Sequence, residues 1–150
     1  MKISLGADER LQVVDAILEE LAMGGHTFSY TGPQSGEAQP EPAHLWPAVA
    51  RRVAEEVASG RSDEGILLCW TGTGVSMAAN KVKGVRAALC FDAETARGAR
   101  LWNNANVLCL SMRLTTPAVA KEILAAWFGT KYQPNPGDDA CLAMIQAMEG

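Results

Sequence analysis

The sequence predicts one α/β domain, a Rossmann-like three-layer α/β/α sandwich in which helices cover both faces of a five-stranded parallel sheet. Three observations lead to this fold class. The chain has 150 residues, which suits one domain with a real core. Short apolar runs alternate with segments of helical period. No internal repeat or linker interrupts the alternation, so we expect a single domain over residues 1–150.

The strands are predicted from short apolar or β-branched runs. The clearest is Gly65-Ile66-Leu67-Leu68-Cys69, which is typical of a buried strand. The expected strands are 3–7, 27–30, 65–69, 85–91 and 107–110.

The helices are predicted from apolar spacing and from start and stop signals. In the first, apolar residues recur from Leu11 to Leu21, Asp8 is the expected N-cap, and Gly24-Gly25 end the helix. The others are expected at 46–57, 73–82, 92–102, 117–127 and, as an added C-terminal helix, about 138–148. Residues 32–42, rich in Gly, Pro, Gln and Glu, are expected to form a mobile loop.

Composition argues against several classes of function. A net charge of -4 without a basic stripe disfavours nucleic-acid binding, and no apolar run approaches the ~20 residues of a membrane span. The four cysteines form no CxxC pair and there are only two histidines, so we expect no zinc site, metal or cofactor. Free thiols and the lack of a signal peptide favour the cytoplasm. The expected partner is a small molecule or another subunit.

The loop after the third predicted strand carries the strongest chemical signal. Ligands of open α/β sheets bind outside the carboxyl ends of the strands. Here Cys69 is followed by Trp70-Thr71-Gly72-Thr73-Gly74-Val75, and the two glycines permit a tight turn that exposes backbone N–H groups. Such donors suit an anion or oxyanion, and Cys69 beside them is a candidate base or nucleophile.

Three interpretations of this loop are open. It is a Gly-rich connection beside a buried cysteine, a dinucleotide-binding turn, or an oxyanion cradle beside a base. The dinucleotide interpretation would use Asp92, but Met77 stands where a third glycine is needed and the motif follows the third strand, not the first.

From Gly65 to Ala88 the sequence resembles the family of ribose-5-phosphate isomerase B and the galactose-6-phosphate isomerase subunits. The stretches that carry the resemblance are Gly65 to Cys69, Thr71 to Ser76, Ala78 to Lys81 and Gly84 to Ala87. Further matches are Gly6-Ala7-Asp8, Asn103 to Leu108 and Ser111-Met112-Arg113, so the resemblance covers about residues 1–130.

The resemblance implies a metal-free, cofactor-free interconversion of aldoses and ketoses through an enediolate. It implies that Cys69 and Thr71 are catalytic, with Cys69 as the base and the N–H groups from Thr71 to Val75 as the oxyanion cradle. It also implies a homodimer or homotetramer with active sites shared between subunits. The expected substrate-binding residues are Asp8, Glu9, Trp46, Trp70, Gly72, Thr73, Gly74, Val75, Trp102, Asn103 and Arg113.

The chain departs from the family pattern at several positions. Glu9 replaces a histidine, Trp102 replaces the histidine that helps to open the sugar ring, and Val75 stands where some relatives carry a Glu base. Trp46 replaces a tyrosine. Arg113 is the last arginine in the chain, so the phosphate clamp of the family is incomplete.

These departures suggest an aromatic pocket around Trp46, Trp70 and Trp102, although each tryptophan alone is more typical of a core. We hypothesise an isomerase whose substrate, phosphorylated or not, is not standard ribose 5-phosphate. The alternative is a non-catalytic, carbohydrate-binding relative.

No role in substrate chemistry is expected for several other polar residues. His26 and His44 are interpreted as surface residues, and Arg97 and Arg100 as a solvated helix face. Asn80 is interpreted as a helix cap, and Asn103 either binds substrate hydroxyls or ends a helix.

Overall fold

The computed structural model describes residues 1–37 and 41–150, and its centre is a parallel five-stranded sheet. The strand order is β2-β1-β3-β5-β4, and every neighbouring pair is parallel. The strands are β1 (Lys2–Ala7), β2 (Thr27–Thr31), β3 (Glu64–Cys69), β4 (Ala87–Leu89) and β5 (Val107–Ser111). The predicted fold class is therefore confirmed.

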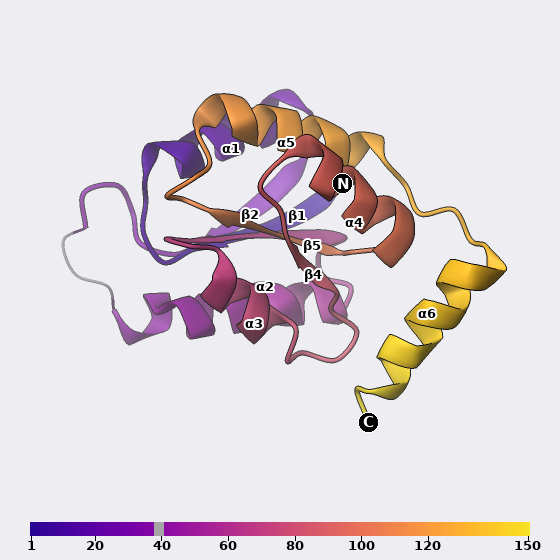
Figure 1. Ribbon diagram of the computed structural model, residues 1–150. Helices are drawn as coiled ribbons and strands as arrows, with labels where there is room; N and C mark the ends of the chain where they lie inside the picture. The colour runs from indigo at the N-terminus through magenta and orange to yellow at the C-terminus, as the bar shows by residue number, and fades with distance from the viewer. Residues whose placement is uncertain (38–40) are drawn as a thin grey trace.

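Helices cover both faces of the sheet (Figure 1). One layer holds α1, α4 and α5, and the opposite layer holds α2 and α3. The helices are α1 (Gln12–Met23), η1 (Pro42–His44, a 3-10 turn), α2 (Trp46–Ala58), α3 (Thr73–Ala79), α4 (Ala93–Asn103), α5 (Pro117–Gly129) and α6 (Pro136–Ala147). Within the described residues, no helix is both long and apolar enough to span a bilayer.

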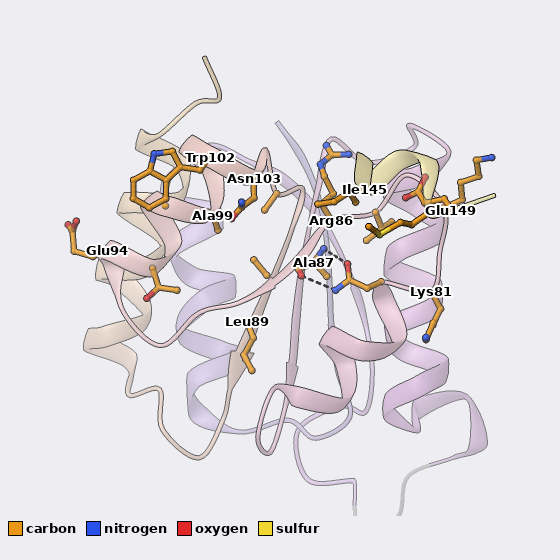
Figure 2. Close-up of a pocket in the computed structure, with 18 residues that line it drawn as sticks. Lys81, Arg86, Ala87, Leu89, Glu94, Ala99, Trp102, Asn103, Ile145 and Glu149 are labelled. Atoms are coloured by element: carbon orange, nitrogen blue, oxygen red, sulfur yellow. Dashed lines mark hydrogen bonds between the residues drawn. The ribbon is translucent and has the colours of Figure 1, made fainter. Parts of the chain in front are cut away.

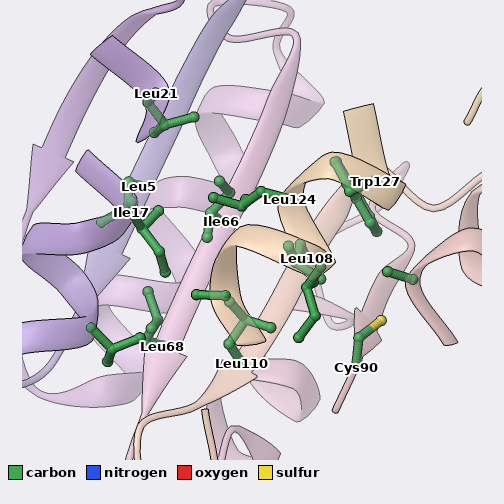
Figure 3. Close-up of a cluster of buried hydrophobic side chains, with 14 of the residues drawn as sticks. Leu5, Ile17, Leu21, Ile66, Leu68, Cys90, Leu108, Leu110, Leu124 and Trp127 are labelled. Carbon is green, nitrogen blue, oxygen red and sulfur yellow. The ribbon is translucent and has the colours of Figure 1, made fainter. Parts of the chain in front are cut away.

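The larger of two apolar clusters fills the space between the sheet and α1, α4 and α5 (Figure 3). Leu5, Ile66 and Leu108 come from three adjacent strands, and Ile17 and Trp127 reach them from the helices. All five side chains are almost completely buried. Burial of this kind stabilises the fold by roughly 1.5–3 kcal/mol for each large aliphatic side chain.

Helix α6 has little contact with the rest of the molecule (Figure 1). None of its residues is buried. The chain beyond it is held by two hydrogen bonds: Lys83 Nζ donates to the Gly150 carbonyl at 2.7 Å, and the Gly84 N–H donates to Glu149 Oε1 at 2.9 Å. The apolar side chains Met144, Ile145 and Met148 remain exposed.

A buried polar cluster fastens the amino end of the sheet. Glu64, the first residue of β3, accepts hydrogen bonds from Trp127 Nε1 and from Arg100, both at 2.6 Å. Arg100 also donates to the carbonyls of Ala105 and Thr130. The expectation of a solvated face at Arg97 and Arg100 is therefore correct for Arg97 and wrong for Arg100, whose guanidinium is largely buried.

Two predicted helix ends are wrong: the start of the first helix and the end of the third. The first helix begins at Gln12 with Leu11 as N-cap and no side-chain cap, so Asp8 does not cap it. The chain needs Asp8 to Leu11 to turn from the strand into the helix. Helix α3 ends at Ala79, with Asn80 as C-cap. Of the predicted loop, residues 38–40 lie outside the described residues.

Candidate functional site

The carboxyl ends of β1 and β3 form the switch point of the sheet. From β1 the chain goes to β2 on one side and then crosses back to β3 on the other. Ligands of open α/β sheets bind in the crevice at such a point. Ala7 is paired with Leu68, so Asp8, which follows β1, and Cys69, the last residue of β3, lie at the same end of two neighbouring strands. Two residues expected from the sequence to form the site are thus neighbours here.

The loop between β3 and α3 depends on glycine at position 72. Gly72 has φ of 75°, and an added Cβ would lie 2.5 Å from Leu89 Cδ1 and 2.9 Å from the carbonyl carbon of Leu110. No other residue combines this backbone with this space. Within residues 1–37 and 41–150, no acceptor receives the N–H groups of Thr73, Gly74 and Val75. These donors suit the oxygen of a ligand.

Backbone hydrogen bonds hold this loop against the loop that follows β5. The Met112 N–H donates to the Cys69 carbonyl and the Arg113 N–H to the Trp70 carbonyl, each at 3.0 Å. The Ser111 hydroxyl donates to the same Trp70 carbonyl at 2.9 Å. These bonds place the backbone of Arg113, whose side chain is exposed, beside the Cys69 loop.

The thiol of Cys69 differs in its surroundings from two deeper thiols. Burial raises the pKa of Cys90 to about 12, and it raises the pKa of Cys109 as well. Those two thiols remain protonated and are poor bases. Cys69 is 5% exposed at the end of its strand, directly before the Gly-rich loop. The fourth thiol, Cys141, is exposed on α6.

The threonines of the loop are exposed and face one another. Thr71 Oγ1 and Thr73 Oγ1 are 2.7 Å apart, and either can donate. This bond fixes the Thr71 hydroxyl, which the sequence predicts to be catalytic, next to the loop. Val75 is completely buried. Its side chain therefore supports the loop from below, and only its backbone N–H is available to a ligand.

A cavity of about 350 Å³ lies on the β1 side of the loop. Trp46 forms one wall, and its ring also packs on Gly74, where an added Cβ would lie 3.0 Å from Trp46 Cε3. The Trp46 side chain therefore contacts both the cavity and the Gly-rich loop. The residues that line the cavity are Asp8, Glu9, Arg10, Leu11, Pro33, Glu37, His44, Leu45 and Trp46.

Acidic groups dominate the electrostatics of this cavity. Burial, and next the charge of Glu9, raises the pKa of the Asp8 carboxyl. Arg10 is already engaged, because its Nε donates to Asp15 Oδ1 at 2.7 Å and its guanidinium lies 4.6 Å from the centre of the Tyr30 ring. An additional anion would find little uncommitted positive charge.

The two histidines occupy different environments, and neither is the plain surface residue that we expected. His26 precedes β2, at the amino end of the sheet, and its partly buried ring stacks on Phe128 with centroids 4.5 Å apart. Burial lowers the pKa of His26. His44 ends η1, lines the cavity with Asp8 and is 22% exposed. Sequence patterns missed His44 because only the fold brings it to the end of β1.

Trp102 and Asn103 lie elsewhere in the molecule. They close α4 and line a groove of about 1130 Å³ between β4 and α6 (Figure 2). Trp70 is 53% exposed and lies on the Cys69 loop. Within one chain, therefore, Trp46, Trp70 and Trp102 do not line a common pocket.

No three His, Cys, Asp or Glu side chains gather into a metal-binding group among residues 1–37 and 41–150. Asp92, which a dinucleotide site would need, instead caps α4 by accepting from the Thr95 N–H at 2.6 Å. This capping role argues against the dinucleotide interpretation, and the backbone N–H groups of Thr73 to Val75 remain compatible with an oxyanion cradle.

Comparisons with known proteins agree with this geometry. Residues 3–144 match the family described as Ribose/Galactose Isomerase, and the chain belongs to that family. It is 37% identical to the D-erythrulose-4-phosphate isomerase of Pectobacterium atrosepticum, over 89% of this chain and 86% of the relative. It is 39% identical to the galactose-6-phosphate isomerase subunit LacB of Clostridium acetobutylicum, over 89% and 75%. The type B ribose 5-phosphate isomerase of Trypanosoma brucei superposes with a TM-score of 0.89 at 40% identity, covering 99% of this chain and 98% of that one.

Proposed function

We propose that this aldose–ketose isomerase acts on an open-chain, four-carbon sugar phosphate, with Cys69 as the base. The observation that carries the proposal is Trp102, which stands where the family resemblance places the ring-opening histidine. An indole cannot exchange a proton with a ring oxygen. The chain is also similar over most of its length to a relative named D-erythrulose-4-phosphate isomerase.

The chemistry of the substrate explains why such an enzyme would not need that histidine. A four-carbon ketose has no hydroxyl beyond carbon 4, and in its 4-phosphate the oxygen on carbon 4 is esterified. The corresponding aldose phosphate is blocked in the same way. Neither sugar can close a five- or six-membered ring, whereas ribose 5-phosphate closes one through its free hydroxyl on carbon 4. A site for four-carbon sugars therefore tolerates tryptophan at position 102.

The proposed reaction needs only groups that the carboxyl end of the sheet supplies. The Cys69 thiolate removes a proton from the carbon next to the carbonyl, and the electron pair of that C–H bond forms the enediolate double bond. The N–H groups of Thr73 to Val75 stabilise the enediolate oxygen. The proton then returns from sulfur to the neighbouring carbon, while the two oxygens exchange one proton. Atoms and electrons balance without a co-reactant.

Solvent-deuterium incorporation, read by NMR, tests this proposal. We expect exchange next to the carbonyl of D-erythrulose 4-phosphate and slower exchange into D-ribose 5-phosphate. Cys69→Ala should lower the rate roughly 10²- to 10⁴-fold, the usual contribution of a general base. Cys141→Ala, which removes the exposed thiol of α6, is the matched control and should change nothing.

Three outcomes would contradict parts of the proposal. Faster exchange into ribose 5-phosphate would exclude the four-carbon preference. A Cys69→Ala protein with the wild-type rate would exclude Cys69 as the base. If the folded wild-type protein exchanged none of the sugars, the non-catalytic, carbohydrate-binding alternative would take the place of the enzyme.

We further propose a homo-oligomer in which Trp102 and Asn103 of one copy complete the site of another. Both residues are exposed in the groove beside β4, away from the Asp8 cavity of their own chain. The groove is lined by Ile145 (Figure 2) and by Met148, whose exposed apolar side chains favour a covered surface. Light scattering measures the oligomeric state. Mixing the inactive variants Cys69→Ala and Asn103→Ala should restore activity only if each site contains residues from two copies.

A further inference from the structure

Two buried polar atoms in the cavity that follows β1 have no hydrogen-bond partner. Asp8 Oδ1 and His44 Nδ1 are both inaccessible to solvent, and within the described part of the chain neither is hydrogen-bonded. The nearest carboxylate to His44 Nδ1 is Glu37, whose Oε2 is 4.0 Å away and thus beyond hydrogen-bond range. Ser4, His26 and Thr115 each carry one such atom as well, but among the described residues only Asp8 and His44 bring two of them into one cavity. Because buried polar groups are nearly always paired, this pair indicates that a bound group contacts both atoms.

The position of this pair relative to Cys69 and Arg113 follows from the sheet. Asp8 follows β1, Cys69 ends β3 and Arg113 follows β5, and these three strands are consecutive in the sheet. At a strand spacing of about 4.8 Å, the Asp8 and Arg113 ends of this row are roughly 10 Å apart. That length suits an extended four-carbon sugar phosphate whose phosphate lies toward Arg113 and whose reacting carbons 1 and 2, at the opposite end, lie between Cys69 and Asp8.

Charge decides which end of such a substrate each group binds. The cavity has three carboxylates, Asp8, Glu9 and Glu37, and its one arginine is already paired with Asp15. A phosphate dianion would be repelled here, whereas a hydroxyl can accept from an imidazole and donate to a carboxylate. Arg113, exposed and cationic, suits the phosphate instead.

We propose that Asp8 and His44 bind the uncharged, hydroxyl-bearing end of the substrate and thereby set its direction past Cys69. His44 becomes a specificity-determining residue, and the substrate phosphate extends toward Arg113. This inference rests on the proposed function for the identity of the sugar. It is nevertheless a statement about binding, so it can be tested without turnover.

The chain contains only two histidines, so the test has a built-in control. The full-length protein labelled with ¹⁵N in its histidines gives two sets of imidazole signals, which the His26→Ala and His44→Ala variants assign. The probes are D-erythrulose, which lacks phosphate, and inorganic phosphate. We expect D-erythrulose to shift the His44 signals and leave His26, at the opposite end of the sheet, unmoved. Inorganic phosphate should move neither.

Kinetics of the variants add a second readout. Loss of one hydrogen bond is worth about 0.5–1.5 kcal/mol, so His44→Ala should raise KM for D-erythrulose 4-phosphate about three- to tenfold. His44→Asn, whose amide can replace one ring nitrogen, should recover part of that loss. Inhibition by inorganic phosphate should be unchanged in both variants and weakened in Arg113→Ala.

The results separate this inference from the proposed function. If D-erythrulose leaves the His44 signals in place while the protein isomerises its phosphate, only this inference is wrong. If the signals shift but no deuterium enters any sugar, only the proposed function is wrong. A His44 shift caused by inorganic phosphate would reverse the direction of the substrate and overturn the inference.

Discussion

A polar cluster lies at each end of the sheet, and the two clusters differ in whether their buried atoms are hydrogen-bonded. At the amino end, both carboxylate oxygens of Glu64 accept a hydrogen bond, one from Arg100 and the other from Trp127, at 2.6 Å each. At the carboxyl end, Asp8 and His44 each keep a buried atom without a partner in the described chain. One cluster is complete without a ligand and the other is not.

This difference indicates that the amino end of the sheet serves stability and the carboxyl end serves binding. The Glu64 cluster connects β3, α4 and α5, and replacing any member leaves a buried partner behind. The Asp8 cavity accepts an energetic penalty in the free protein, which a bound hydroxyl would offset. Stability should therefore be concentrated at the amino end and binding at the carboxyl end.

The largest effect on stability is expected from Glu64→Ala. It leaves the guanidinium of Arg100 and the indole N–H of Trp127 without their acceptor, and breaking a buried pair lowers the free energy of unfolding by about 3–5 kcal/mol. Urea denaturation measures it. The matched control is Glu94→Ala, whose 3.1 Å pair with Arg97 is solvent-exposed and worth at most about 1 kcal/mol. Equal losses in the two variants would mean that the amino-end cluster is not special.

An intermediate effect is expected from Trp127→Phe. Phenylalanine fills most of the space of the indole ring, but Glu64 loses one hydrogen-bond donor. This loss should lower the free energy of unfolding by about 1–3 kcal/mol. Trp70→Phe is the control: its side chain is 53% exposed and, within the part of the chain that the structure describes, only its backbone carbonyl is hydrogen-bonded, so the free energy of unfolding should change by less than about 0.5 kcal/mol. A Trp70→Phe loss as large as that of Trp127→Phe would refute the assignment of stability to the amino end.

The smallest effect concerns pH and Asp8. Burial and Glu9 raise the pKa of this carboxyl above its ordinary 3.8, so the folded protein holds the proton more tightly than the unfolded chain does. The stabilisation is full below pH 3.8 and disappears as pH rises through the raised pKa. Asn at position 8 does not titrate. Between acid and neutral pH, the free energy of unfolding of the wild type should therefore fall relative to that of Asp8→Asn, by less than about 1 kcal/mol.

Urea unfolding at several pH values measures this difference. A constant gap between Asp8→Asn and wild type at all pH values would contradict an uncompensated carboxylate at position 8. Asp8→Asn should lower kcat/KM even at pH values where it does not lower stability. A Glu64 variant, in contrast, should keep the wild-type kcat/KM for its folded fraction.

The sequence predicts the fold well because the strands are short, apolar and separated by helical periods. Local signals were less reliable for element ends. Asp8 resembles an N-cap by its position, but α1 begins only at Gln12, after the turn out of the strand. In the same way, residues 85–91 were expected to form a strand, and only Ala87–Leu89 pair with β5.

The sequence groups candidate site residues only where they are local along the chain. Cys69 and the Gly-rich loop form one continuous motif, and Asp8 follows the first strand. His44 and the pairing of Glu64 with Arg100 were not predicted, because each depends on segments that only the folded chain brings together. Arg100 was interpreted as solvated because its helix carries other charges; nothing in the local pattern marks Glu64 as its partner, 36 residues away.

Asn80 gives the outer edge of the sheet an unusual finish. Its side-chain amide donates to the Ala87 carbonyl and accepts from the Ala87 N–H, both at 2.9 Å, as a neighbouring strand would. One side chain thereby occupies the place at which another strand would begin to add to β4. A second copy that meets this edge therefore finds the N–H and carbonyl of Ala87 already paired, which disfavours extension of the sheet beyond β4.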